Sequence, residues 1–390
     1  MSLPLRTVHV NTERTWRGGE QQTLSLVSGL RKRGHEVWLV AQPGSPLARK
    51  ARDLGIEVAE IPMRGEADLV AAWRISRLLR QVDAEIVHMH TSHAHTLGCV
   101  GSMIARRGMR LVSRRVDFTI YRNRLRLSRY KYGRFVDRFV AISQAVRQAL
   151  LDDGIDGQRI SIVHSGIDLD RHPLVAPEEV AARRRALRQE LGVSENAELV
   201  LNVAHFGWHK AQEVLVQATP AIVAERSQAL VLFAGEGELL DKVKAEALAL
   251  CPKDRVRFLG FRQDIDRLLD GCDVFVMCSV MEGLCTSILD ALARRRPVVA
   301  SEVGGMPEIV EEGATGRLVP PRDPAALARA VVDLLTDRQQ AERLALAGRE
   351  RVESRFSVDA MVEGTLGVYR DVLRGDTGGR VVKAELQSIP

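Results

Sequence analysis

The chain has 390 residues, 45% of them hydrophobic and 27% charged, which is the balance of a folded protein and the length of two or more domains. No apolar run approaches the roughly 18 residues of a membrane span, and the first residues lead into a strand-like stretch, so we expect neither a membrane anchor nor a secretory leader. The five cysteines show no C-x-x-C spacing, which excludes a disulfide framework and a zinc ribbon and indicates a cytoplasmic protein.

The net charge is +6, and the positive charge is concentrated between residues 101 and 140. This segment holds twelve lysines and arginines against Asp117 and Asp137, a formal charge of +10. Such a field attracts a phosphorylated acceptor, an acidic lipid surface or nucleic acid, and the alternative is an ordinary solvated helix surface. The basic residues that we assign to an acceptor or a membrane surface are Arg114, Arg115, Arg122, Arg126, Arg129 and Lys131.

The first half of the chain alternates short β-branched runs with amphipathic stretches. In the first amphipathic stretch Leu24, Val27 and Leu30 recur every three residues and Gly34 follows as a stop signal, which predicts a helix. Alternating strands and helices predict a parallel sheet covered by helices on both faces. The predicted strands are residues 7–11, 36–40, 85–89, 110–113, 139–142 and 160–164.

The alternation stops between residues 168 and 180, which include Pro173 and Pro177, and restarts after a charged helix. We therefore predict an α/β protein of two doubly wound, Rossmann-like domains that face a cleft, at residues 1–170 and 171–356. Residues 376–390 lack periodicity and are expected to form a mobile tail. The predicted strands of the second half are residues 199–204, 229–234, 256–260, 274–277, 297–301 and 316–319.

Three loops each follow a strand and precede a helix, where such sheets bind ligands. Gly18 and Gly19 follow the first strand, and backbone N–H groups there suit a phosphate, with a plain strand-to-helix turn as the alternative. Their spacing is neither G-x-G-x-x-G nor the P-loop pattern, which counts against classical dinucleotide and P-loop sites. The second loop runs from His205 to Lys210, a lysine that either pairs with a phosphate or is an ordinary surface residue. The third contains Gly235.

A fourth segment, from Glu282 to Asp290, combines carboxylates with a helix start. Gly283 allows a ligand to approach the backbone closely, and the following N–H groups are expected to be free at the start of the helix. Carboxylates accept hydrogen bonds from sugar hydroxyls, so Glu282 is a candidate sugar ligand, with an N-terminal capping acid as the alternative. The expected backbone donors are Leu284, Cys285 and Thr286.

In this order, the four segments resemble the retaining family 4 nucleotide-sugar glycosyltransferases of the bacterial group 1 type, which have the GT-B architecture. The resemblance runs from Val8 to about Arg374 and is most specific over residues 282–320. It implies an N-terminal acceptor-binding domain, a C-terminal donor-binding domain for a nucleotide sugar, and a last helix at 357–375 that returns to the first domain.

The resemblance also implies the roles of individual residues. Glu282 would hold the hydroxyls of the donor sugar, Lys210 the diphosphate and Asp290 the ribose. The other implied donor-binding residues are Gly18, Gly19, His205, Gly235, Phe261, Arg262, Gly283, Leu284, Cys285 and Thr286.

The sequence departs from the family pattern at four positions. His205 stands where an arginine is usual, so the diphosphate would lose one permanent charge. Ala211 replaces a glycine, Ser165 replaces an asparagine, and Asp290 replaces a glutamate, which shortens its reach by one methylene. Three of these positions lie near the expected donor, so the departures concern donor binding rather than the fold.

The N-terminal half is expected to supply the acceptor site. His90 ends a strand, and the resemblance implies that His90 or Asp117 acts as the base or the orienting group for the acceptor. Zinc binding by the histidines between residues 88 and 95 is the alternative. No Asp-x-Asp motif at a strand end indicates a metal, so we expect no cofactor and a metal-independent reaction in which positive side chains and helix dipoles stabilise the leaving diphosphate.

These features predict a retaining glycosyltransferase that moves a sugar from a nucleotide diphosphate sugar, UDP preferred, to a glycan or lipid-linked acceptor. The expected setting is cell-envelope polysaccharide or lipopolysaccharide synthesis, in the cytoplasm or peripherally on the inner face of its membrane. Two alternatives stay open. One is a nucleotide-sugar epimerase of the same architecture, against which the spacing from Glu282 to Asp290 counts. The other is a non-catalytic basic module that binds anions or nucleic acid.

Overall fold

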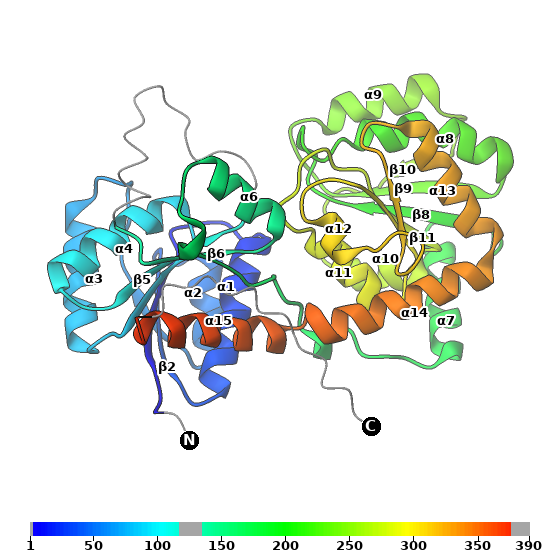
Figure 1. The fold of residues 1–390 in the computed structure, drawn as a ribbon. Helices are drawn as coiled ribbons and strands as arrows, with labels where there is room; N and C mark the ends of the chain where they lie inside the picture. The colour runs from blue at the N-terminus through cyan, green and yellow to red at the C-terminus, as the bar shows by residue number, and fades with distance from the viewer. Residues whose placement is uncertain (1–2, 117–134, 376–390) are drawn as a thin grey trace. The chain divides into compact units, whose positions relative to one another are not determined.

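The computed structural model describes residues 3–116 and 135–375, and it contains two sheets in two compact units (Figure 1). Unit 1 comprises the chain up to Ile167 together with the residues from Phe356 onward, and unit 2 comprises Asp168–Arg355. The strand pairs within both sheets are parallel, which confirms the prediction of two Rossmann-like domains. The described ranges leave out the predicted tail at 376–390 and five predicted site residues: Asp117, Arg122, Arg126, Arg129 and Lys131.

Unit 1 is built on a seven-stranded sheet in the order β3-β2-β1-β4-β5-β6-β7. The order changes direction between β1 and β4, and doubly wound sheets bind ligands at the carboxyl ends of the strands at such a switch point. The strands are β1 (Arg6–Val10), β2 (Glu36–Ala41), β3 (Glu57–Glu60), β4 (Ile86–Met89), β5 (Met109–Arg114), β6 (Arg138–Ala141) and β7 (Ile160–Ile162). The helices are α1 (Gly18–Lys32), α2 (Pro46–Asp53), α3 (Leu69–Gln81), α4 (Ser92–Ala105), α6 (Gln144–Asp152) and α15 (Val358–Leu373).

Strand β3 is the element of this sheet that the sequence analysis missed. It pairs with β2 at the edge of the sheet, and its residues Glu57 to Glu60 carry a charge at each end and little buried surface. Short, charged edge strands protect a sheet against edge-to-edge association. They also lack the continuous apolar run by which buried parallel strands are found in a sequence.

Helix α15 belongs to unit 1, although all of unit 2 precedes it in the chain. The start of α15 is bonded to Ile167, the last residue of the first segment of unit 1. Val358 N donates to Ile167 O at 2.9 Å. It packs on α1, where a Cβ on Gly29 would lie 2.5 Å from Val362 Cγ2. Tyr369 is fully buried in the same core. The helix that the family resemblance implied at 357–375 therefore completes the core of unit 1.

Unit 2 is built on a six-stranded sheet in the order β10-β9-β8-β11-β12-β13, which changes direction between β8 and β11. The strands are β8 (Glu198–Val203), β9 (Ala229–Ala234), β10 (Val256–Phe258), β11 (Val274–Met277), β12 (Val298–Ser301) and β13 (Arg317–Val319). The helices are α7 (Pro177–Glu190), α8 (Gln212–Glu225), α9 (Leu240–Leu250), α10 (Ile265–Gly271), α11 (Thr286–Ala293), α12 (Met306–Ile309), α13 (Pro324–Thr336) and α14 (Arg338–Arg355).

A buried carboxylate anchors the amino-terminal edge of this second sheet. The side chain of Asp273 is 1% exposed and accepts a hydrogen bond from Leu199 N at 2.8 Å. It also pairs with Arg188 at 2.7 Å, with Arg338 at 2.8 Å and with Arg184. Burial raises the pKa of a carboxyl, but the surrounding arginines outweigh it and hold the pKa of Asp273 below its ordinary value. This network ties α7 and α14 to the sheet.

Candidate functional site

Two loops of unit 2 meet at the carboxyl ends of β8 and β11, which are neighbours in the sheet. Val280 N, after β11, donates to His209 O, after β8, at 2.9 Å. Cys278 Sγ donates to Lys210 O at 3.5 Å. Because the strand order changes direction between these two strands, the loops lie at the place where a doubly wound sheet binds its ligand.

Lys210 and Glu282 form an ion pair between the two loops. Their side chains are 16% and 15% exposed, and Ser279 Oγ donates to Glu282 Oε2 at 3.5 Å. Burial acts to lower the pKa of Lys210, but the facing carboxylate outweighs it, so the pKa is raised and the lysine stays charged. The structure thus brings the two residues predicted for the diphosphate and the sugar into direct contact.

A glycine pair that the sequence analysis did not assign to the site fixes the backbone of Glu282. Gly305 N donates to Glu282 O at 3.0 Å. Gly304 has φ +55°, and a Cβ there would lie 1.8 Å from Glu282 O, so a side chain cannot be accommodated. The signal was present in the sequence as two adjacent glycines shortly after a buried strand.

Helix α11 begins at Thr286, directly after the buried residues Gly283, Leu284 and Cys285. Within the described part of the chain, the N–H groups of these three residues donate to no protein acceptor. With the positive end of the helix dipole, they offer a place for a negatively charged group near Lys210. Burial raises the pKa of the Cys285 thiol to about 12, so this thiol is protonated at neutral pH and is not a nucleophile.

The loop that carries Lys210 ends at Ala211, whose φ of +48° and ψ of 44° lie in the left-handed region. A residue with a Cβ is strained there by about 1–2 kcal/mol, whereas glycine is not. Alanine in place of the family's glycine therefore strains the backbone locally at this position.

His205 and Gly235, both predicted to bind the donor, have contacts within unit 2 that account for them. His205 Nε2 lies 3.0 Å from Glu238 Oε2, and both side chains are exposed. A Cβ on Gly235 would lie 2.0 Å from Ala204 O, so the close approach of the two loops is sufficient to explain the glycine.

Phe261 and Arg262, predicted to border the base, follow β10. Phe261 is 65% exposed, which leaves its ring open to stacking. The Arg262 guanidinium is held by Asp264 at 2.7 Å and by Glu190 at 2.8 Å. Arg262 is therefore already neutralised inside unit 2.

Asp290, predicted to bind the ribose, lies on α11 with a side chain that is 34% exposed. Its Oδ1 is 3.2 Å from Nε2 of His172, a buried residue near the start of unit 2. Sequence analysis did not single out His172, because it stands alone in an irregular segment with no periodicity or motif around it.

In unit 1 those predicted residues that the structure describes lie at or after the carboxyl ends of β1, β4 and β5. Gly18 and Gly19 open α1, and a Cβ on Gly19 would lie 3.9 Å from Arg115 Cδ. Arg114 ends β5, and Arg115 follows it. Arg115 Nη2 lies 3.4 Å from His90 Nδ1, and Arg115 Nε is buried with no partner among the described residues. Burial lowers the pKa of Arg115 to about 10, so the guanidinium stays charged at neutral pH.

Three buried histidines pack together next to Arg115. His9 on β1 and His88 on β4 are partners in the strand register, and His90 follows β4. Arg115 can only donate, so His90 accepts at Nδ1, carries its proton on Nε2 and donates to His9 Nδ1 at 3.0 Å. Burial lowers the pKa of all three, to about 3 for His9, so they are neutral. His90 is therefore placed to orient Arg115, since both of its ring nitrogens are engaged.

The same three histidines lie close enough to share a cation, with ligand atoms within 4.8 Å of one another. His88, however, already bonds Tyr369 Oη at 2.7 Å and Ser113 Oγ at 2.8 Å. Histidines that bind a metal normally donate from their second nitrogen to an acceptor, whereas His90 faces a guanidinium donor there. These contacts favour ordinary hydrogen-bonded histidines over a set of zinc ligands.

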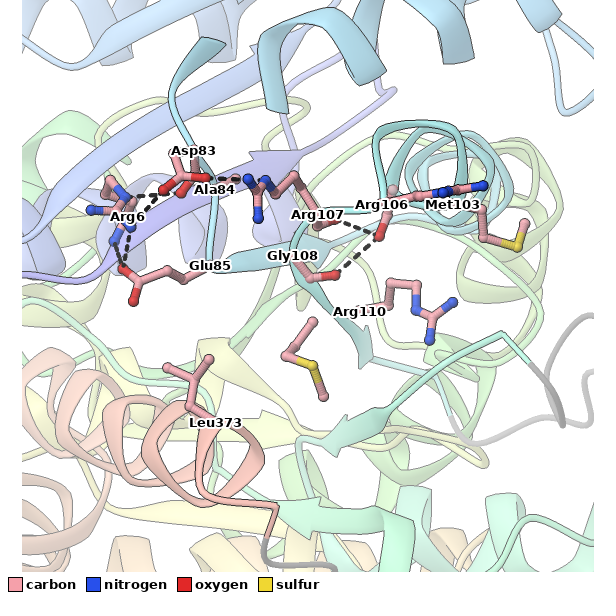
Figure 2. Close-up of a pocket in the computed structure, with 12 residues that line it drawn as sticks. Arg6, Asp83, Ala84, Glu85, Met103, Arg106, Arg107, Gly108, Arg110 and Leu373 are labelled. Carbon is pink, nitrogen blue, oxygen red and sulfur yellow. Dashed lines mark hydrogen bonds and ion pairs between the residues drawn. The ribbon is translucent and has the colours of Figure 1, made fainter. Parts of the chain in front are cut away.

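A hollow of about 590 Å³ opens at the amino-terminal edge of the sheet of unit 1 (Figure 2). Three of its arginines are already paired, since Arg6 and Arg107 both bind the Asp83 carboxylate at 3.1 Å and Arg110 binds Asp137 at 2.8 Å. We assign this hollow no part in the site, because parallel sheets bind their ligands at the opposite edge. Its lining is Arg6, Asp83, Ala84, Glu85, Ser102, Met103, Arg106, Arg107, Gly108, Met109, Arg110 and Leu373.

Two family models match the chain: Glycosyltransferase Family 4 over residues 16–171 and Glycosyl transferases group 1 over residues 183–351. The N-acetyl-alpha-D-glucosaminyl L-malate synthase of Bacillus anthracis is 26% identical over 375 residues, which cover 90% of this chain and 93% of that protein. With four further curated relatives, the matched region spans 47% to 62% of the relative's own length.

Solved structures share the fold. Anabaena HepE in complex with UDP and glucose has a TM-score of 0.80 at 21% identity, over 94% of this chain and 99% of that one. A glycosyltransferase from Rickettsia africae has a TM-score of 0.82 at 20% identity, over 95% and 99%. The likeness confirms the GT-B fold. The two family models, which together match residues 16–171 and 183–351, show that the chain belongs to the group 1, family 4 glycosyltransferases.

Proposed function

We propose that this protein is a retaining glycosyltransferase that moves a sugar from a nucleotide diphosphate sugar, preferably UDP-linked, to a glycan or lipid-linked acceptor. The observation that carries the proposal is the largely buried Lys210–Glu282 pair, whose glutamate stands just before the backbone N–H groups that lead into helix α11. A cation, a carboxylate and free backbone N–H groups at one helix start are the groups that a diphosphate and a sugar require. The preference for UDP is supported by Anabaena HepE, which was solved with UDP and glucose.

In this proposal Lys210 and the backbone N–H groups of residues 283–286 hold the diphosphate, and Glu282 accepts hydrogen bonds from the sugar. Negative charge grows on the diphosphate as its bond to the anomeric carbon breaks. The lysine and the helix dipole stabilise that charge more strongly than they stabilise the intact donor, which is what accelerates the step. Because these groups supply the stabilisation, we expect the reaction to proceed without a metal ion.

Unit 1 supplies the acceptor site, and we propose that the acceptor carries an anionic group. Arg115 is held by His90 and keeps a buried Nε that lacks a partner among the described residues. A phosphate or a carboxylate fits a guanidinium in this position. The Bacillus anthracis relative supports this reading, because it is named for L-malate, which is an anion at neutral pH.

We further propose a cytoplasmic protein that acts in cell-envelope polysaccharide or lipopolysaccharide synthesis and docks peripherally through the basic segment 101–138. None of the described helices combines the length and the apolar character that a bilayer crossing requires. Attraction to acidic lipid contributes about 1 kcal/mol per basic residue near the surface. In liposome co-sedimentation, binding should rise with acidic lipid and fall with salt, and equal binding to neutral vesicles would contradict the docking. We expect no nucleic acid partner.

The test of the proposed function is a thermal-shift panel of UDP, GDP, ADP and their sugars. A nucleotide at a hundred times its dissociation constant should stabilise the folded protein by about 2.7 kcal/mol. NMR of the sugar after incubation then separates transfer or hydrolysis with retained configuration from epimerisation at another carbon. A panel in which no nucleotide raises the melting temperature would overturn the proposal.

A further inference from the structure

We infer that the outer face of helix α3 docks on an anionic membrane surface, with its apolar residues inserted among the lipid headgroups and its arginines on the lipid phosphates. The inference rests on the peripheral docking in the proposed function and deepens it. It names a contact element outside the basic segment 101–138 and adds apolar insertion to charge attraction.

The inner face of α3 fixes the helix to the rest of unit 1. Helix α3 packs along α4 (Figure 1). A Cβ on Gly101 of α4 would lie 2.8 Å from Ile75 Cγ2 and 3.1 Å from Ala72 O, so the two helices are in close contact. The outer face of α3 therefore belongs to a firmly packed helix. The buried residues of α3 are Ala71, Ala72, Ile75, Ser76 and Leu79.

The outer face begins with three exposed apolar side chains. Leu69 is 72% exposed, Val70 59% and Trp73 49%. Leu69 and Val70 each lie about one turn before Trp73, so the three side chains are neighbours on one side of the helix. A surface helix normally carries polar residues on the side away from the core, and exposed apolar residues that cluster there mark a contact site.

Arginines continue this face along the helix. Arg74, Arg77 and Arg80 are exposed, and the sequence of α3 contains no Asp or Glu. Arg77 Cζ lies 5.2 Å from the centre of the Trp73 ring, and Arg80 Nη2 donates to Ile104 O of α4. Among the residues that the structure describes, none of the three arginines forms an ion pair, so their charges are available to an external anion.

Two carboxylates in the loop before α3 have partners of their own. Asp68 caps the helix, because its Oδ1 accepts from Ala71 N at 2.9 Å and its Oδ2 accepts from Arg64 N at 3.1 Å. Glu66 Oε1 accepts from Ser92 Oγ at 3.4 Å. The positive end of the helix dipole offsets the charge of Asp68, so this carboxylate opposes an anionic partner only weakly.

A hollow of about 680 Å³ adjoins the start of α3. Arg64 and Arg74 line it together with the apolar Val70. Sites for small molecules have volumes of about 300–1,000 Å³, so the hollow accommodates a lipid headgroup. Guanidinium groups suit the phosphate of that headgroup, since arginine matches two phosphate oxygens with two donors. The hollow therefore gives one headgroup a binding position beside the inserted side chains.

An anionic bilayer matches this face better than an acidic protein does. A bilayer presents phosphates above an apolar layer at every point of its surface, and tryptophan and arginine are side chains that bridge these two layers. A stable protein interface takes about 20–30 residues on each side, far more than one helix face supplies. Docking through unit 1 also brings the proposed acceptor-binding domain to a lipid-linked acceptor.

The first experiment measures binding of the full chain to vesicles of phosphatidylcholine with and without phosphatidylglycerol. On the mixed vesicles we expect Leu69→Ser/Trp73→Ser to weaken binding roughly 10-fold, the loss of two partly buried apolar contacts. We expect Arg74→Gln/Arg77→Gln to weaken it roughly 30-fold and to reduce its dependence on salt. Both variants replace exposed side chains, so their melting temperatures should match that of the wild type.

Matched controls carry the same changes on helices of unit 2. Leu248 of α9 is 88% exposed, and α9 carries acidic and basic residues together. Leu248→Ser, and the pair Arg329→Gln/Arg343→Gln that removes two exposed arginines, should stay within about 3-fold of the wild type. The thermal shift by a bound nucleotide should be the same in all these variants, because none of the substituted residues lies in the donor loops.

The second experiment locates the insertion directly. Lipids that are brominated in their acyl chains quench a tryptophan that enters the bilayer. Trp73→Phe should remove most of this quenching, whereas Trp208→Phe, at an exposed tryptophan of unit 2, should leave it.

The outcomes separate this inference from the proposed docking. Failure of the wild type to bind mixed vesicles would overturn both. Wild-type binding that the α3 variants retain would overturn this inference alone, and docking would then rest on the basic segment. Weaker binding of the arginine variant to polyglutamate, with vesicle binding unchanged, would point to an acidic protein partner instead. Quenching that persists in Trp73→Phe would exclude insertion through α3.

Discussion

The Lys210–Glu282 pair gives the sharpest prediction about catalysis. Glu282→Gln keeps the shape of the side chain but removes the charge that accepts sugar hydroxyls, and Lys210→Ala removes the cation from the leaving diphosphate. A group that acts mainly in the transition state lowers kcat and kcat/KM together when it is deleted. We expect each variant to lose about 10²- to 10³-fold in kcat, as enzymes do when one preorganised electrostatic contact is removed.

The same substitutions should also affect folding, and the structure sets the size of the effect. The two side chains are 16% and 15% exposed, so removing one partner leaves a largely buried, uncompensated charge. We expect a loss of about 3 kcal/mol in the free energy of unfolding for either variant, the lower end of the range for buried pairs because some solvent contact remains. The double variant Lys210→Met/Glu282→Gln should recover much of this stability without recovering activity.

The assay is donor turnover by folded, purified variants, with release of the nucleoside diphosphate as the readout and urea unfolding as the check on stability. His93→Ala is the control, since its side chain is exposed on α4 of unit 1 and belongs to neither of the two loops. If Glu282→Gln and Lys210→Ala both keep kcat near the wild-type value, the pair is a structural contact and the catalytic assignment is wrong.

Three other predictions concern the stability of the fold and the independence of the reaction from metal ions. Ala211→Gly should raise the free energy of unfolding by about 1 kcal/mol with unchanged turnover, because it relieves the left-handed strain, and a loss of stability in urea would contradict this. Asp273→Asn should destabilise the fold by about 3–5 kcal/mol at pH 7. The pKa of Asp273 is lower in the folded than in the unfolded protein, so its contribution is complete above about pH 4 and declines as the pH falls further, and melting curves of the variant should lack this acid-dependent loss. Turnover should be unchanged by EDTA. Activity that is lost in EDTA and restored by Mg²⁺ or Mn²⁺ would contradict the metal-free mechanism.

The donor side of unit 2 was predictable because its residues lie in short segments at strand ends. Lys210 and Glu282 follow adjacent strands of a parallel sheet, and that topology alone brings their loops together. Gly304 was visible as part of a glycine pair, but its role depends on a backbone approach that only three-dimensional packing reveals. The edge strand β3 was not predicted, because it begins and ends with a glutamate and contains no continuous apolar run.

The histidine contacts could not be predicted from the sequence. His90 drew attention as a titratable residue at a strand end, yet its partners His9 and Arg115 come from two other strand ends. These side chains come together because of the strand register, which no single segment of the sequence specifies. His172 and Asp290 are likewise far apart in the chain and belong to no shared motif. Long-range polar contacts of this kind carry no periodicity, so they cannot be read from spacing.

The return of α15 to unit 1 has a consequence for the order in which the chain is made. A ribosome releases residues 1–167 before any of unit 2, but the helix that buries Tyr369 and Val362 against that segment is synthesised only after unit 2. Unit 2 is contiguous in the sequence, so it can finish folding on emergence, while unit 1 waits with part of its apolar core uncovered. During synthesis the first unit to begin is thus the last to be completed, and chaperones that bind exposed apolar surface have their longest opportunity on the N-terminal segment.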